Sequence, residues 1–289
     1  MKSLCLFASY LPSNTLPYYV KVYLEELKKH FSEVQLLGHV KLESRDEEYL
    51  KQSGIHYIRE LNEGYDFGLW YKALKAIDAV SYDRIALVND SCILFKPLKA
   101  FMNALEQSRA DVYGMTCSEA ISLHVQSYFL ILNKKAIAPA LAYFNQMGIG
   151  HNLQEVIRMY EVGLSRHLME KGLRLEAFVD NKDYKGEFSP YYHLLDHHLK
   201  QGIPLIKKKI IFSSYRKDEL FTLARMNFKI RPEKYIDRIL NDRESLLKRE
   251  ELMKDISGSL SALQRLRYAT LRLGIHSLKS FKNLFSSAR

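Results

Sequence analysis

Short apolar runs alternate along the first half of the chain with segments in which apolar residues recur every three or four positions. An apolar run of about four to eight residues is typical of a buried strand, and the wider spacing is typical of an amphipathic helix. Strands that alternate with helices indicate an α/β fold with a mostly parallel sheet flanked by helices. The predicted strands are Ser3–Ala8, Val34–Leu37, Ile55–Ile58, Arg84–Val88, Val112–Met115 and Tyr128–Leu132, and the predicted helices include Thr15–Phe31, Glu47–Gln52 and a segment from Phe67 to Ile77.

Two C-terminal segments differ from this α/β domain, to which we assign residues 1–230. Residues 231–256 are predicted to form a charged surface helix, because 14 of the 25 residues from Arg231 to Asp255 are charged, seven of each sign. Residues 257–289 begin with a Ser-Gly-Ser hinge and hold six basic residues and no acidic ones, with apolar residues at helical spacing. Such a basic amphipathic helix predicts an extension that binds an anionic membrane surface. Docking on a partner, or on the domain itself, is the alternative.

Composition narrows the classes of function. The net charge is +10, and six of these charges come from the tail, so the charge does not indicate a nucleic-acid-binding domain. No run of about 18 apolar residues, no export signal and no CxxC spacing of the three cysteines is present. We therefore expect a cytoplasmic protein, peripheral on the inner face of the plasma membrane. Serine-hydrolase, P-loop and HExxH patterns are absent from the sequence.

The first candidate binding segment is the glycine-bearing loop from Asn62 to Gly68, just before a predicted helix. Ligands of parallel α/β sheets bind beyond the carboxyl ends of strands. Glycine lets the backbone approach such a ligand, and Asn62 and Asp66 offer polar groups to a base or a ribose. The alternative is a strand-to-helix turn in which Asp66 caps the helix.

The second candidate is Asn89-Asp90-Ser91, directly after the apolar strand that ends at Val88. A carboxylate at a buried strand end is costly unless a cation or hydrogen-bond donors surround it. A divalent metal that carries a diphosphate would supply this charge. An aspartate that caps the following turn explains it equally well.

The order of these motifs resembles the rhamnan synthesis protein F family, whose members are known or presumed glycosyltransferases of bacterial surface polysaccharide assembly. The resemblance covers residues 3–212. It rests on Asn-x-Gly-Tyr-Asp-Phe-Gly from Asn62, on Asn-Asp-Ser from Asn89, on His124–Phe129 and on Gly202–Lys207. The opening strand, Leu4–Ala8, also resembles the start of the family.

The same segments resemble the nucleotide-sugar half of GT-A-type (Rossmann-like) glycosyltransferases. The resemblance implies a divalent metal, Mg²⁺ or Mn²⁺, as cofactor. This sequence departs from the GT-A pattern because Asn89-Asp90-Ser91 has one carboxylate where that pattern has two, which leaves strict metal dependence open. By this resemblance the nucleotide-sugar site holds Asn62, Gly64, Asp66, Asn89, His124, Gln126 and Lys207, and Asp90 binds the metal.

Glu161 is the candidate catalytic base. Residues 160–168 resemble a GT-A helix entrance at which an acid serves as base toward the acceptor hydroxyl, although Val162 replaces the second acid of that pattern. A carboxylate in the first turn of a helix is also stabilised by the helix dipole, so a purely structural role for Glu161 is the alternative.

Histidine and lysine clusters near the end of the domain complete the candidates. His193 and His197 would share one face of a helix, and this spacing permits a metal site. The lysine run 207–209 could meet a diphosphate or lie at the membrane side, and Lys207 lies in the family-like segment.

The resulting hypothesis is a glycosyltransferase. It would transfer a sugar, rhamnose by the family resemblance, from a nucleotide-sugar donor to a lipid-linked polysaccharide or lipopolysaccharide acceptor, with inversion. A retaining transferase and a catalytically silent membrane-associated scaffold of polysaccharide assembly are the alternatives.

Overall fold

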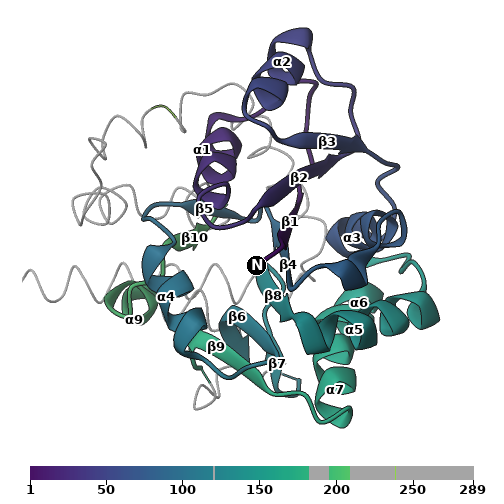
Figure 1. Cartoon of the computed structure of the whole chain (residues 1–289), viewed down its shortest axis with the longest axis vertical. Coiled ribbons are helices and arrows are strands. Elements are labelled where there is room, and N and C mark those ends of the chain that lie inside the picture. Colours follow the sequence, from purple (N-terminus) through teal and green to yellow (C-terminus); the bar gives the residue numbers. More distant parts are fainter. Residues whose placement is uncertain (120, 182–194, 209–237, 239–289) are drawn as a thin grey trace, which may run out of the picture. The chain divides into compact units, whose positions relative to one another are not determined.

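The computed structural model describes residues 1–119, 121–181, 195–208 and 238, and in them strands and helices alternate (Figure 1). The strands are β1 (Ser3–Ala8), β2 (Glu33–Gly38), β3 (His56–Arg59), β4 (Arg84–Asn89), β5 (Cys92–Leu94), β6 (Val112–Ser118), β7 (His124–Val125), β8 (Phe129–Asn133), β9 (Leu175–Val179) and β10 (Leu205–Lys207). The helical segments are α1 (Tyr18–Leu27), α2 (Ser44–Gln52), α3 (Tyr65–Lys75), η1 (Ala79–Ser81), α4 (Lys99–Gln107), α5 (Lys134–Met147), α6 (Leu153–Val156), η2 (Ile157–Val162), α7 (Gly163–Glu170) and α9 (Leu195–Lys200).

The main sheet has the strand order β3-β2-β1-β4-β8-β6-β7, with β9 paired to β6. Strands β1 to β4 are mutually parallel, as the alternating pattern predicts. Strand β8 is antiparallel to both of its neighbours. The chain passes from β6 to β8 through β7 without a crossover helix, and a connection of that kind joins antiparallel strands. The prediction of an α/β fold with a mostly parallel sheet is therefore confirmed, with β7 and β8 as antiparallel members.

Helices cover both faces of the sheet, which explains the unbroken apolar run of β1. Leu4 and Leu6 join a core cluster with residues of α3 and α5. Phe7, on the opposite face, packs edge-on against Tyr23 of α1 at 5.2 Å between ring centroids. Since neither face meets water, every position of this strand is apolar or small.

The observed elements differ from the predicted ones mainly at their ends. Helix α1 begins at Tyr18 rather than at Thr15, because Pro17 has an extended backbone with ψ at 144°. Helix α3 begins at Tyr65, inside the predicted loop. Apart from Arg238, the predicted charged helix 231–256 and the tail 257–289 lie outside the described residues.

No helix in the described part of the chain is both long enough and apolar enough to span a bilayer.

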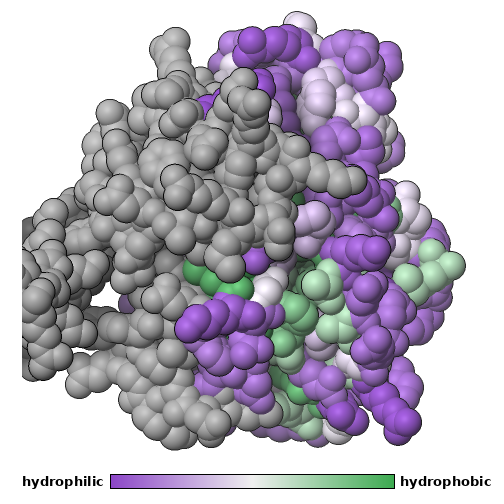
Figure 2. Space-filling model, turned by 90° about the vertical axis from the view of Figure 1, so that its left-hand side faces the viewer, coloured by the Kyte–Doolittle hydropathy of each residue, from purple (hydrophilic) through white to green (hydrophobic). Residues whose placement is uncertain are grey.

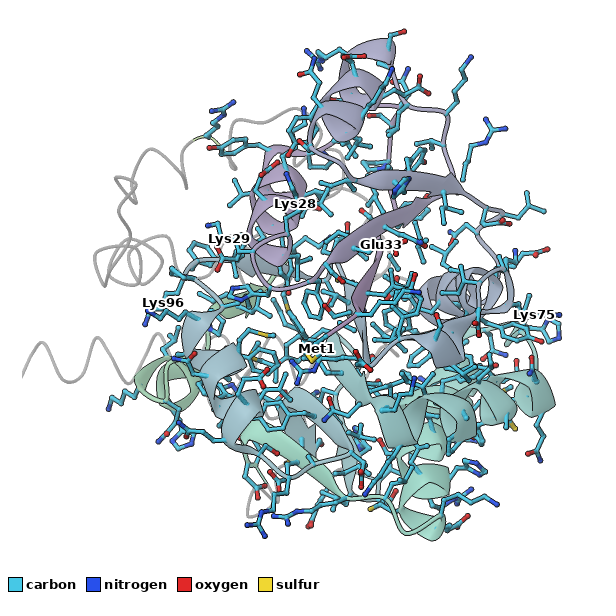
Figure 3. The ribbon with its side chains drawn as sticks, in the orientation of Figure 1. Met1, Lys28, Lys29, Glu33, Lys75 and Lys96 are labelled. Carbon is cyan, nitrogen blue, oxygen red and sulfur yellow. The ribbon has the colours of Figure 1, made fainter. Side chains whose placement is uncertain are left out.

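Charged residues lie at the ends of elements. Lys28 and Lys29 follow α1, and Lys75 ends α3; all three are exposed (Figure 3). At the amino edge of the sheet, the Glu33 carboxylate accepts a hydrogen bond from the Tyr82 hydroxyl at 2.7 Å. Figure 2 shows one face, on which a group of apolar residues lies in the lower half beside hydrophilic ones. The predicted residues Asp66, Asn89 and Asp90 lie at the opposite, carboxyl edge of the sheet.

Candidate functional site

The carboxyl ends of β1 and β4 lie side by side and create the centre of the site. Ala8 and Asn89 are register partners at these ends. The Asp90 amide donates to the Ala8 carbonyl at 3.1 Å, and the Ser9 hydroxyl donates to Asp90 Oδ2 at 2.8 Å. The turn predicted to bind a diphosphate is therefore fixed against the end of the first strand.

A lysine that is distant in sequence pairs with Asp90. Lys208 Nζ lies 3.2 Å from Asp90 Oδ2, and the two side chains are only 3% and 7% exposed. Tyr19 of α1 bridges the pair, because its hydroxyl lies 3.1 Å from Lys208 Nζ and 3.4 Å from Asp90 Oδ2. A buried charge is stable only when it is paired and hydrogen-bonded, and these contacts meet that requirement.

A two-stranded ribbon brings Lys208 to this place. Strand β10 runs antiparallel to β5, with Lys207 opposite Cys92. The Lys208 amide then donates to the Ser91 carbonyl at 2.9 Å. The ribbon thus places two consecutive lysines beside the turn that follows β4.

The glycine loop is joined to the same turn by a side-chain hydrogen bond. The Asn89 amide donates to Asp66 Oδ2 at 2.7 Å, and the Ser91 backbone amide donates to Asn89 Oδ1 at 3.0 Å. Asp66 lies in the first turn of α3, and the capping position is taken by Gly64. The alternative in which Asp66 caps the helix is therefore wrong. The Asp66 carboxylate instead lies at the carboxyl edge of the sheet, where it accepts the hydrogen bond from Asn89.

The backbone of this loop depends on its glycines. Gly64 has a φ of 72°, in the left-handed region that glycine adopts without strain. The next residue, Tyr65, keeps a φ of 58° and is exposed. At Gly68 a Cβ would lie 1.7 Å from the Glu63 carbonyl oxygen, so no other residue fits without rearrangement.

The segment before β8 contributes a buried polar group to the same edge. Thr116 hydrogen-bonds Gln126 Oε1 and the Tyr128 hydroxyl, each at 2.7 Å. Burial raises the pKa of Tyr128 well above its usual value, so the phenol stays protonated. Lys207 Nζ lies 5.2 Å from the centroid of the Tyr128 ring. Gln126 is therefore held inside the fold by Thr116, and Lys207 lies over the ring of Tyr128.

Glu161 reaches this edge from a helix. The Ser127 amide lies 3.4 Å from Glu161 Oε1, and the carboxylate is half-buried. Tyr160 stacks on Phe67 of α3 at 5.0 Å, which packs the Glu161 segment against the helix that follows the glycine loop. The structure thus brings Glu161 and the glycine loop to neighbouring elements.

The prediction that Glu161 opens a helix is wrong. The helical stretch begins at Leu153, where the Asn152 side chain caps it by accepting from the Glu155 amide at 2.9 Å. It continues through the π-helical segment η2 into α7. Since Glu161 lies two turns inside this stretch, stabilisation by the helix N-terminus does not explain a carboxylate there.

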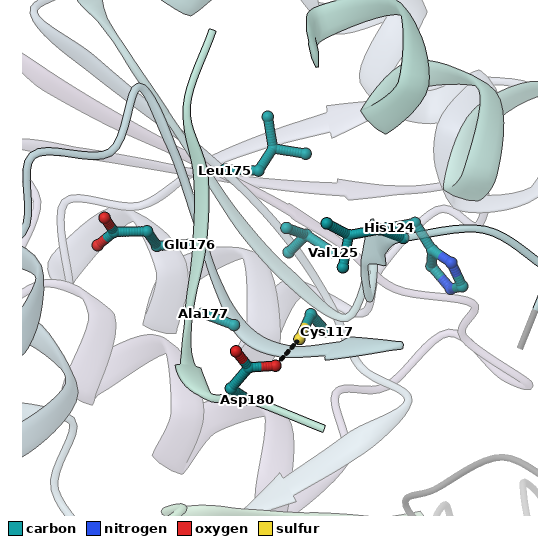
Figure 4. A pocket seen from close by; sticks show the side chains of 8 residues that line it. Cys117, His124, Val125, Leu175, Glu176, Ala177 and Asp180 are labelled. Carbon is teal, nitrogen blue, oxygen red and sulfur yellow. Dashed lines mark hydrogen bonds between the residues drawn. The ribbon is translucent and has the colours of Figure 1, made fainter. Parts of the chain in front are cut away.

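Two predicted residues lie apart from this centre. Asn62, the first residue of the glycine loop, is exposed. His124 hydrogen-bonds the Ser122 carbonyl at 2.8 Å and is among the residues that line another cavity, although its ring points away from Cys117 and Asp180 (Figure 4). That cavity encloses about 180 Å³, and in it the Cys117 thiol donates to Asp180 Oδ1 at 3.0 Å.

The structure describes only part of the histidine cluster whose spacing permits a metal site. His193 lies outside the described residues, and His197 is exposed. His198 is buried and donates from Nε2 to Asn181 Oδ1 at 3.0 Å. Burial lowers the pKa of His198 to about 4, so it is a neutral, structural group at neutral pH.

The side chains around Asp90 do not suit a divalent cation. Asp90 Oδ2 is already in contact with an ammonium and two hydroxyl groups. The neighbouring amide oxygen of Asn89 accepts from Ser91. Within residues 1–119, 121–181 and 195–208, His, Cys, Asp and Glu side chains do not gather in groups of three or more that could hold a metal. The expected metal at Asp90 therefore does not fit these donors.

Sequence reasoning missed Ser9 and Tyr19, and it did not pair Lys208, a member of the predicted lysine run, with Asp90. The position of Ser9 could have indicated it as a candidate, because Ser9 follows the first predicted strand just as Asp90 follows the fourth. Lys208 adjoins the predicted Lys207, but nothing local ties it to Asp90.

Comparison with solved structures gives distant similarities. A glucose-1-phosphate thymidylyltransferase, named as putative, from Bacillus anthracis is 9% identical with a TM-score of 0.44, over 62% of this chain and 86% of its own. A nucleotide-diphospho-sugar transferase, also named as putative, from Desulfovibrio desulfuricans is 14% identical with a TM-score of 0.40, over 70% and 97%. A cytidylyltransferase from Leptospira borgpetersenii is 17% identical with a TM-score of 0.42, over 71% and 97%. At these TM-scores none of them supports an argument about this chain.

Comparison with protein families gives a firmer result. No curated protein matches the sequence significantly. The family described as rhamnan synthesis protein F matches residues 34–246, which is more than half of the chain and includes both polar loops, Glu161 and both lysines of the ribbon. The chain belongs to the rhamnan synthesis protein F family.

Proposed function

We propose that this protein is a glycosyltransferase that uses a nucleotide-sugar donor. One observation carries the proposal: two polar loops, 62–68 and 89–91, meet through the hydrogen bond between Asn89 and Asp66 at the carboxyl edge of β1 and β4. Ligands of α/β sheets bind at this edge. Membership of a family named for rhamnan synthesis supports a sugar as the transferred group.

The reaction needs one base and one cationic partner for the leaving group. In this proposal the diphosphate of the donor lies near Lys207, with the nucleoside along the loop of Gly64 and Asp66. Glu161 takes the proton of the acceptor hydroxyl, the hydroxyl oxygen bonds to the anomeric carbon, and the bond from that carbon to the diphosphate breaks. Attack from the face opposite the diphosphate inverts the anomeric carbon. If the enzyme retains configuration instead, Glu161 is not the base.

The acceptor and location extend the proposal beyond the described residues. The family name favours a rhamnose donor and a growing surface polysaccharide, carried on a lipid, as acceptor. The basic tail 257–289 would hold residues 1–230 at an anionic membrane surface on the cytoplasmic side, with 231–256 as a surface helix between them.

A thermal-shift titration with thymidine, uridine and guanosine diphosphates tests the proposed function. A ligand that binds only the native state raises the melting temperature, and we expect one base to be preferred. The variant Asn89→Ala should lose this shift, whereas Gln52→Ala, at the exposed end of α2, should keep it. If no nucleoside diphosphate raises the melting temperature, the protein is instead the catalytically silent scaffold.

A further inference from the structure

The position expected to hold a metal is filled by the protein's own cation. Lys208 Nζ lies 3.2 Å from Asp90 Oδ2, the oxygen that also receives the Ser9 hydroxyl. Both charged side chains are almost completely buried. A metal ion could bind this oxygen only if the ion pair were broken.

The ribbon adds a second lysine beside the ion pair. Asp90 contributes one negative charge and Lys207 and Lys208 contribute two positive ones, so these three residues together carry a net charge of +1. Both ammonium groups lie near the buried Cys92 thiol, where they oppose the rise in its pKa that burial causes. Lys207 is only half-buried, whereas Lys208 is 2% exposed.

We propose that Lys207 and Lys208 replace the divalent cation, so that this protein binds a nucleoside diphosphate without metal. Lys208 neutralises Asp90 and fixes the turn after β4. Lys207, the more exposed of the two, meets the diphosphate. This inference rests on the proposed function, because it names the groups that would bind its donor.

The charges make this division of roles reasonable. A carboxylate without a cation would repel a diphosphate at the same edge, and Lys208 removes that repulsion through a contact of 3.2 Å. Lysine is a common phosphate ligand that acts as a point charge. The hydrogen bond from the Lys208 amide to the Ser91 carbonyl, 2.9 Å long, keeps the lysine pair in register with the turn.

Calorimetric titration of the full chain with thymidine, uridine and guanosine diphosphates, in EDTA and in Mn²⁺, tests the inference. We expect the dissociation constant for the preferred diphosphate to agree within about twofold between the two conditions. Mn²⁺ would tighten the binding of the diphosphate only if the protein held the ion in contact with it. Binding that appears only with Mn²⁺ overturns the inference and leaves the proposed function intact. If no diphosphate binds in either condition, both fail.

Variants test the role of Lys207 separately. In EDTA, Lys207→Met should weaken diphosphate binding at least about tenfold, while the matched control Lys99→Met, on the exposed side of α4, should leave it unchanged. Lys207→Arg keeps the charge and should retain most of the affinity. Unchanged binding by Lys207→Met overturns the inference. If that variant does not fold, the titration of the unaltered chain in EDTA still decides the question.

Discussion

Removing the Lys208 charge should strongly destabilise the protein. In Lys208→Met the Asp90 carboxylate, which is 7% exposed in the unaltered chain, loses its ammonium partner and keeps the Ser9 and Tyr19 hydroxyl groups as neighbours. Breaking a buried ion pair by removing one partner costs about 3–5 kcal/mol, whereas an exposed pair contributes about 0–1 kcal/mol. We therefore expect the free energy of unfolding to fall by about 3–5 kcal/mol.

Urea denaturation of the full chain, followed by circular dichroism, measures this loss. The double variant Asp90→Asn/Lys208→Met should be more stable than Lys208→Met alone, because it leaves no unpaired buried charge. The control Lys99→Met should stay within about 0.5 kcal/mol of the unaltered chain. A loss below about 1 kcal/mol in Lys208→Met, or strict additivity of the two substitutions, would refute the reasoning from burial.

Three further predictions concern the base, the glycine loop and a buried histidine. Glu161→Gln should keep nucleotide binding and the melting temperature but lower the transfer rate by about 10² or more, as measured by release of nucleoside diphosphate; a lower melting temperature with an unchanged rate would give Glu161 a structural role. Gly68→Ala should destabilise the chain by at least about 1–3 kcal/mol in urea, because its Cβ would lie 1.7 Å from the Glu63 carbonyl oxygen, and an unchanged midpoint would contradict that packing. The pKa of His198 is lowered in the folded state to about 4, so as the pH drops the unfolded chain binds a proton at this histidine before the folded chain does. The free energy of unfolding should therefore fall between about pH 6.5 and 4, by at most about 3 kcal/mol. His198→Asn should flatten that part of the pH profile of the melting temperature.

The tail gives a prediction about membranes. Vesicle sedimentation should show that the full chain binds anionic vesicles and that a chain truncated after residue 256 does not, because six basic residues and no acidic ones lie in 257–289. High salt should weaken the binding, since the Debye length falls to about 3 Å at 1 M. Equal binding by both chains would exclude the tail as the anchor.

The elements that local patterns specify were predictable from the sequence. Strands β1 and β4 are short apolar runs, and their burial on both faces makes them easy to recognise. The turn Asn89–Ser91 and the glycine loop follow from residue types that lie next to one another. Their joining through Asn89 and Asp66 agrees with the general rule that parallel strands end at one edge.

The contacts between distant segments were not predictable. Lys208 pairs with Asp90 across 118 positions of the sequence, and only the β5–β10 ribbon explains the pairing. The predicted start of the helix that bears Glu161 was wrong for two reasons. The residue that caps this helix, Asn152, lies nine residues before Glu161, and the π-helical segment η2 interrupts the α-helical spacing of apolar residues between them. Tertiary structure decides the first case, the pairing of Lys208, and the second, the helix start, depends on a cap in the same helical stretch that the sequence pattern did not reveal.

Hydrogen–deuterium exchange of the full chain, with and without its preferred nucleoside diphosphate, tests the central claim most directly. If the nucleotide binds at the carboxyl edge of β1 and β4, amides in 62–68, 89–92 and 205–208 should exchange more slowly in its presence, because a bound ligand suppresses local opening. Amides of α2, whose residues take no part in the site, should be unaffected. Binding that leaves exchange in 62–68 and 89–92 unchanged would contradict the account.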